Sequence, residues 1–114
     1  MSDIEFKTGD ADIVGAILKQ NGVGINLTGY SVNFIMKNTM NSENERVTIP
    51  CTLNSVVNGV SVPATSGGVS IPFTAIHTAA AGNYNGEFII TCAQTIAHIP
   101  SGNSYITLTI WESL

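Results

Sequence analysis

The chain has 114 residues, a net charge of −4 and a charged fraction of 11%, which is less than half the roughly 25% of an average soluble domain. Its four basic residues never cluster, which excludes the basic face that binds nucleic acid. No apolar run approaches the roughly 20 residues that cross a bilayer, and the N-terminus lacks the apolar core of a signal peptide. We therefore expect one domain over residues 1–114, made in a cytoplasm, with no membrane or nucleic-acid partner.

The dominant pattern is an alternation of apolar and polar residues with period two, which is typical of half-buried strands. Pro50 lies within one alternating segment, and because proline has no backbone N–H to donate, that segment is expected at a sheet edge. Asn-Gly and Gly-Gly pairs between segments are strong turn signals. In chain order, the expected strands are residues 13–19, 32–37, 47–53, 56–62, 69–73, 83–92 and 105–111.

Only residues 74–81 have a composition that suits a helix, and a Gly at 82 would end it after about one turn. About 7–9 short antiparallel strands with regular turn signals predict an all-β fold, an immunoglobulin-like sandwich. The apolar phase of the regular strands predicts the core, namely Phe34, Tyr84, Phe88, Ile90, Ile106, Leu108 and Ile110.

The two cysteines, Cys51 and Cys92, invite comparison with the immunoglobulin disulfide. That bridge packs against a tryptophan that lies between the two cysteines in sequence, whereas Trp111 follows both of them here. Synthesis in a cytoplasm also disfavours a bridge. We interpret both residues as buried free thiols that act as small hydrophobic side chains.

No constellation of residues indicates catalysis. His77 and His98 have no cysteine or carboxylate close in sequence, so neither predicts a zinc site. The acidic pair Asp10 and Asp12 lacks the dense run of oxygen ligands that a calcium loop provides. The sequence also lacks a Gly-x-Ser-x-Gly elbow and a complete phosphate-binding loop. We expect no enzyme activity, no cofactor and no metal.

Three aromatic residues, Tyr30, Tyr105 and Trp111, are candidates for a sugar-stacking platform. Tyr105 and Trp111 share a strand face but are six residues apart, which is roughly 20 Å along a strand. That separation is too large for one sugar ring. Packing in the core or in a subunit interface is therefore favoured, and carbohydrate binding remains the weaker alternative.

Several short motifs occur in an order that matches a known family. They are Leu27-Thr28-Gly29 followed by an alternating strand with Phe34 and Met36, then Gly68-Val69, then Ala81-Gly82-Asn83-Tyr84, then Glu87-Phe88 and a closing strand over 104–110. This order resembles the N-terminal domain of the phage baseplate upper protein family. The resemblance implies an immunoglobulin-like sandwich that assembles into a virion and binds neighbouring subunits. Ala-Gly-x-Tyr is also the pattern of a tyrosine corner, whose hydroxyl bonds an upstream backbone group, here expected within residues 77–81.

On this basis we interpret the protein as a non-enzymatic structural protein of a phage tail, baseplate or fibre. Its expected partners are other virion subunits and further copies of itself. Residues 47–86 contain no Asp, Glu, Lys or Arg, and such a surface is cheap to desolvate. The candidate interface residues are Ser61, Ser70, Tyr105 and Trp111. The main alternative is a carbohydrate-binding or adhesin-type immunoglobulin-like module, and a hydrolase ranks last.

Overall fold

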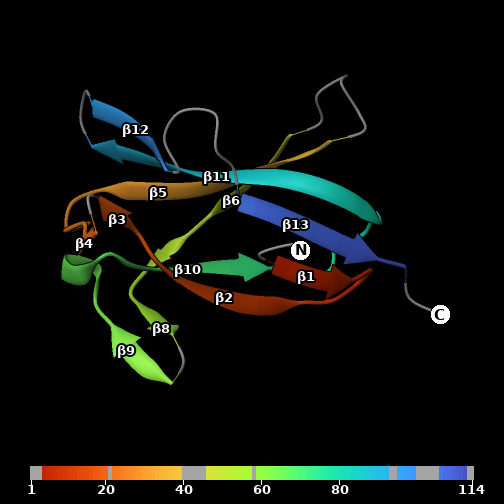
Figure 1. The fold of residues 1–114 in the computed structure, drawn as a ribbon, viewed down its shortest axis with the longest axis horizontal. Coiled ribbons are helices and arrows are strands. Elements are labelled where there is room, and N and C mark those ends of the chain that lie inside the picture. The colour runs from red at the N-terminus through yellow and green to blue at the C-terminus, as the bar shows by residue number, and fades with distance from the viewer. Residues whose placement is uncertain are drawn as a thin grey trace.

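The computed structural model describes residues 4–20, 22–39, 46–57, 59–92, 95–99 and 106–112 (Figure 1). Strands dominate these residues, and the only helical segment among them is the 3-10 turn η1, Ala64–Ser66. The predicted all-β sandwich is confirmed. The strands are β1 (Ile4–Lys7), β2 (Asp12–Ile17), β3 (Lys19–Gln20), β4 (Val23–Gly24), β5 (Ser31–Asn38), β6 (Arg46–Pro50), β7 (Thr52–Leu53), β8 (Ser55–Val57), β9 (Val60–Val62), β10 (Gly68–Phe73), β11 (Gly82–Cys92), β12 (Thr95–Ile99) and β13 (Ile106–Trp111).

The larger sheet has the order β1–β13–β11–β5–β6, and β12 also pairs with β11. Strand β11 is its centre, because it pairs with β5 along one side and with β13 and then β12 along the other. Most of these pairings are antiparallel, as expected. The exception is β1, a strand that the sequence pattern did not predict, which lies parallel to β13.

The strand expected at 47–53 is divided between the two sheets. Strand β6 ends at Pro50 and forms an edge of the larger sheet, so the edge position of this proline is confirmed. After Cys51, strand β7 pairs with β10 in the smaller sheet, whose order is β2–β10–β7. The chain thus crosses from one layer of the sandwich to the other at Cys51, and Cys51 N–H donates to the carbonyl of Val32 as it leaves the larger sheet.

Two short hairpins contain the Asn-Gly pairs. Strands β3 and β4 flank residues 21–22, and strands β8 and β9 flank residues 58–59. Gly22 and Gly59 have φ of 78° and 79°, a left-handed conformation that glycine adopts without strain. Figure 1 shows the β8–β9 hairpin projecting away from both layers.

The core lies between the two sheets and follows the predicted phase of the strands. Six of the seven predicted core residues are buried, and Ile106 is partly buried against them. The Phe34 centroid is 5.1 Å from that of Phe88, on the neighbouring strand of the same sheet, and 6.0 Å from that of Phe73, in the opposite layer. Gly86, which is on the same face of β11, leaves room for Phe34, because a Cβ at this position would lie 2.9 Å from Phe34 Cε1.

Residues 74–81 form hydrogen-bonded turns and bends, so the helical turn expected there is replaced by a non-helical connection. His77 N–H donates to the carbonyl of Thr74, and the ring of His77 in turn accepts a hydrogen bond from Thr74 N–H at 2.9 Å. A polar side chain thus satisfies the backbone locally, which competes with helix formation. At the end of this connection, the Tyr84 hydroxyl donates to the carbonyl of Ala80 at 2.8 Å, within the range 77–81 expected from the sequence.

Candidate interaction surface

The uncharged segment 47–86 contributes strands to both layers and forms the whole of the β8–β9 hairpin. Val60 is 63% exposed and Val56 is 64% exposed, and Ser61 lies directly opposite Val56 on an exposed face. Val60 lies on the other face of the hairpin, opposite Val57. We call the three exposed residues Val56, Val60 and Ser61, which cover both faces, the hairpin surface. Apolar side chains this exposed on a projecting hairpin are available to a partner.

The base of the hairpin is fixed to the outer face of the smaller sheet by Asn54. Asn54 N–H donates to the carbonyl of Gly68, and its side-chain oxygen accepts from Ala64 N–H at 2.9 Å. Asn54 has φ of 75°, a left-handed conformation that asparagine tolerates better than most residues. The sequence analysis missed this residue, although an asparagine between two strand patterns is a recognised turn signal.

Gly15 of β2 lies directly under the hairpin. A Cβ at Gly15 would lie 2.6 Å from Ser55 Oγ and would also collide with the carbonyl oxygen of Val56. Ser55 is buried, and its hydroxyl has no hydrogen-bond partner among the described residues. The close approach of β8 to β2 therefore depends on a glycine at position 15.

The two candidate serines differ in their surroundings. Ser61 is exposed on β9, as its strand phase predicted. Ser70 is half-buried on β10, and its hydroxyl donates to the carbonyl of Asn54 at 2.8 Å. Ser70 is therefore less available to a partner than Ser61, because its side chain helps to hold the hairpin base against the sheet.

The candidate residue Trp111 does not join this surface. Trp111 is 56% exposed at the end of β13, and its indole N–H donates to a Glu5 carboxylate oxygen at 3.1 Å. In Figure 1 the end of β13 and the β8–β9 hairpin lie on opposite sides of the molecule. Tyr105 lies outside the described residues, and Tyr30 is half-buried.

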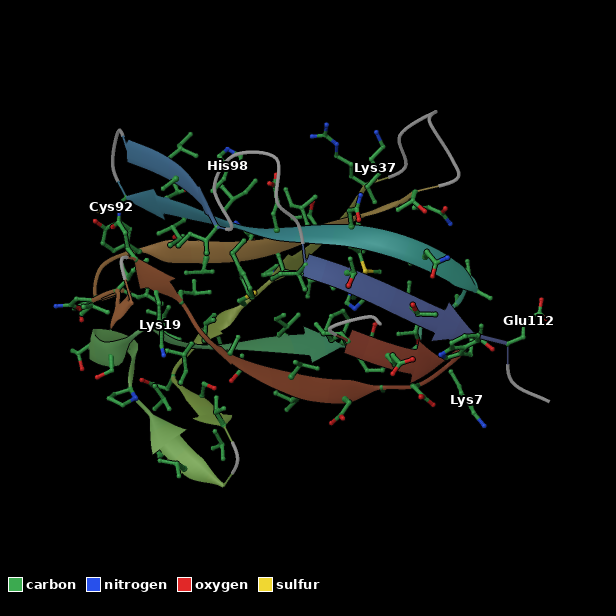
Figure 2. The ribbon with its side chains drawn as sticks, viewed as in Figure 1. Lys7, Lys19, Lys37, Cys92, His98 and Glu112 are labelled. Carbon is green, nitrogen blue, oxygen red and sulfur yellow. The ribbon has the colours of Figure 1, made fainter. Side chains whose placement is uncertain are left out.

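The titratable side chains make isolated contacts. His98 Nδ1 lies 3.2 Å from Glu87 Oε1 on the outside of the larger sheet, and Figure 2 shows His98 on that layer, far from Lys7 and Glu112. Asp10 and Asp12 accept hydrogen bonds from the backbone N–H groups of Lys7 and Ile13. Within the described residues, no three His, Cys, Asp or Glu side chains gather to hold a metal ion, and no helix is long and apolar enough to cross a membrane.

Cys51 and Cys92 are free and half-buried. Burial raises the pKa of the Cys51 thiol from 9.0 to about 12, and a backbone hydrogen bond from Phe34 opposes part of this increase. The thiol also donates weakly to the carbonyl of Ile49, with a sulfur–oxygen distance of 3.6 Å. A thiol with a raised pKa is a poor nucleophile at neutral pH, which agrees with a packing role for Cys51.

Comparison with known proteins shows a similarity of fold to solved structures. No protein-family model matches the chain, and no curated protein matches it. Among solved structures, the fold is similar to that of the N-terminal domain of phage TP901-1 ORF48, with a TM-score of 0.58 and 14% sequence identity. The similarity covers 97% of this chain and 84% of that one. The two chains share a fold, and the resemblance to a phage domain that the sequence suggested is borne out at the level of the fold.

Proposed function

We propose that this protein is a non-enzymatic structural component of a bacteriophage virion, in the tail, baseplate or fibre, and that it acts through protein–protein contacts. The observation that carries this proposal is the fold shared with the N-terminal domain of phage TP901-1 ORF48 over 97% of the chain. The ordered sequence motifs that resemble the N-terminal domain of baseplate upper proteins support the same class of protein. The protein would be made in the host cytoplasm and carried in the particle.

We propose that the hairpin surface is a contact with a neighbouring virion subunit. Its side chains are exposed and uncharged, so their desolvation costs little when a partner covers them. The hairpin is anchored at its base by Asn54 and by the close contact with Gly15. Because its base is anchored, the hairpin loses little conformational entropy when a partner binds it, which favours association.

The chain provides a matched pair of variants to test this contact. Val60 and Val23 each follow an Asn-Gly pair in a short hairpin, and they are 63% and 69% exposed. Val60→Lys, alone or with Ser61→Lys, places charge on the hairpin surface, whereas Val23→Lys places the same charge on the β3–β4 hairpin. We expect Val60→Lys to reduce incorporation into particles at least tenfold, in line with an uncompensated charge in an interface, while Val23→Lys assembles normally.

The measurement is immunoblotting of purified particles from a phage that lacks the gene and is complemented with each variant. Thermal unfolding of the purified variants must show unchanged stability, so that a loss of incorporation reports on contact and not on folding. Normal incorporation of the Val60→Lys, Ser61→Lys variant would refute the hairpin contact. Absence of the wild-type protein from particles would refute the virion role itself.

A further inference from the structure

The outer face of the larger sheet carries a row of three polar side chains where β1, β13 and β11 lie side by side (Figure 1). Glu5 of β1 and Asn83 of β11 are both directly opposite Thr109 of β13. Leu108 and Ile110 are buried in the core, so Thr109 and its two partners point to the outer side of the sheet. Segments far apart in the sequence thus place a carboxylate and an amide on either side of one threonine.

The indole ring of Trp111 lies beside this row. Trp111 is two residues after Thr109, so it points to the same face, and its own partner in register is Lys7. Its indole N–H nevertheless donates to Glu5 Oε1 at 3.1 Å, so the ring extends back along β13 to the level of Thr109. Because Trp111 is 56% exposed, much of the ring surface is open to a ligand.

Hydrogen bonds within the row fix the polar side chains. The Thr109 hydroxyl donates to Asn83 Oδ1 at 3.1 Å, and Thr109 itself is only 9% exposed. Glu5 and Asn83 are both exposed. Within the described residues, no partner bonds the amide nitrogen of Asn83 or the second carboxylate oxygen of Glu5. The row therefore presents a hydrogen-bond donor and an acceptor beside an open aromatic ring.

These three groups match the chemistry of a sugar. A pyranose ring has a C–H face that packs on an aromatic ring, and its hydroxyl groups both donate and accept hydrogen bonds. A carboxylate accepts from such a hydroxyl, and an amide N–H donates to one. The Cα atoms of Glu5 and Asn83 are two strand spacings apart, about 10 Å. One sugar residue can therefore reach both side chains, which a platform of Tyr105 and Trp111 did not allow.

The surroundings of Trp111 favour a sugar over a protein partner. A tryptophan that anchors a protein interface lies in a well-packed centre from which water is excluded. On the outer face of β1, β13 and β11, the side chains near Trp111 are polar instead, namely Glu5, Lys7, Asn83, Thr107 and Thr109. An isolated ring among hydrogen-bonding groups lacks the apolar surroundings of such an anchor.

We propose that Trp111, Glu5 and Asn83 form a saccharide-binding site on the outer face of the larger sheet. The C–H face of one pyranose ring stacks on the Trp111 indole. Neighbouring hydroxyls of the same sugar donate to the Glu5 carboxylate and accept from the Asn83 amide. The site is separate from the hairpin surface, and the inference does not depend on the proposed virion role.

The test is nuclear magnetic resonance of the nitrogen-15-labelled full chain, titrated with methyl glucoside, methyl galactoside, N-acetylglucosamine and rhamnose. The chain has one tryptophan, so the indole N–H resonance reports on this site alone. At least one of these sugars should shift the Trp111 indole and Asn83 amide resonances in a saturable way. An open face that holds one ring should give a Kd of about 10 mM or tighter.

Matched variants separate binding from folding. Trp111→Ala should weaken binding at least about tenfold, whereas Trp111→Phe, which keeps an aromatic ring, should stay within about threefold of the wild type. Asn83→Asp keeps the oxygen that Thr109 bonds and removes the N–H donor, so it should weaken binding about tenfold. Ile96→Ala is the control, because it removes another exposed apolar side chain, on β12. It should leave the Kd unchanged.

The inference is overturned if none of the four sugars binds, or if the shifted resonances exclude Trp111 and Asn83. Equal binding by wild type and Trp111→Ala would also overturn it. A loss of Trp111→Ala from particles, with no sugar bound by the wild type, would assign this face to a protein contact instead. A wild type that enters particles and binds no sugar removes the saccharide site alone, and one that binds sugar but is absent from particles removes the virion role alone.

Discussion

The outer faces of the two sheets differ, although both sheets are built from the same alternating pattern. The larger sheet carries Lys37, Arg46, Glu87 and His98 on its outer side, and Lys37 lies directly opposite Arg46. The outer side of the smaller sheet carries Ile13, Gly15, Ser70 and Pro72, with no charge, and the β8–β9 hairpin lies over part of it. The charged side chains are thus on the outer side of the larger sheet, and the uncharged outer side of the smaller sheet is where we propose contact with a partner.

This difference has a simple physical basis. Inward residues of both sheets are determined by the need to fill one core, so they are equally apolar. The polarity of outward residues depends instead on what contacts them, because charged side chains are costly to bury without a partner. The lack of charge on the outer side of the smaller sheet is therefore the basis on which we propose contact there. The predictions below test first the shared core and then features specific to single positions.

The largest expected effect is in the shared core. Phe88 is 2% exposed and contacts Phe34 between the layers. Phe88→Ala should lower the free energy of unfolding by about 3–5 kcal/mol, because it leaves a cavity that the sheets cannot close. Urea denaturation measures this change. Val56→Ala on the hairpin surface is the control, and a loss of similar size there would contradict the division between core and contact surface.

A smaller loss of stability is expected at Gly86, where the larger sheet leaves no space for a side chain. A Cβ at Gly86 would lie 2.9 Å from Phe34 Cε1 and 3.1 Å from Leu108 Cδ1. Gly86→Ala should therefore lower the free energy of unfolding by about 1–3 kcal/mol through overpacking. The double variant Gly86→Ala, Phe34→Leu should lose less than the sum of the single variants in the same denaturation assay. Additive losses would show that the two positions do not compete for space.

The Tyr84 hydroxyl provides a test of the connection between the layers. Tyr84→Phe removes the hydrogen bond to the Ala80 carbonyl and keeps the buried ring. We expect a loss of about 1 kcal/mol in the free energy of unfolding. Tyr30→Phe is the matched control, because the Tyr30 hydroxyl bonds no described residue. Equal effects of the two substitutions would argue against a tyrosine corner.

At neutral pH the smallest expected effect is that of the Cys51 thiol, where the chain crosses between layers, because its effect on stability depends on alkaline pH. Its pKa is raised to about 12 by burial, so the native state holds the thiol proton after the unfolded chain has released it. Stability that depends on this proton is complete below pH 9 and is lost as the pH rises toward 12. The urea midpoint of the wild type should fall more over this range than that of Cys51→Ala, with Cys92→Ala as the control. If the urea midpoints of wild type and Cys51→Ala changed equally with pH, the raised pKa of Cys51 would be contradicted.

The sequence predicted the regular parts of the larger sheet because each strand there is buried on one face. Phe34, Phe88 and Leu108 are on the apolar phase of long alternating segments, and all three are buried as expected. It did not predict β1, because four residues at the start of the chain are too few to show a period. It allowed at most one short helical turn near 74–81, and the structure has none there, because the His77 side chain satisfies the backbone.

The candidate surface was predicted in part. The uncharged stretch and the outward phase of Ser61 could be read from the residues, because charge and period are local properties. The role of Ser70 could not, since its hydroxyl bonds Asn54, sixteen positions away in sequence. The close packing at Gly15 and the unpaired side of β2 also depend on which strands lie next to them. A local sequence pattern does not predict these neighbours.

The sequence by itself determined the strand periodicity, the core residues, the edge position of Pro50 and the lack of charge between residues 47 and 86. These follow from side-chain polarity and from the two-residue repeat of a strand, which act within a few positions. Only the tertiary structure decided that the chain changes sheets at Cys51, that β8 rests on Gly15, and that β2 pairs with a described strand, β10, on one side only. Those features depend on which segments, distant in sequence, lie next to each other. Packing between the layers decides this arrangement.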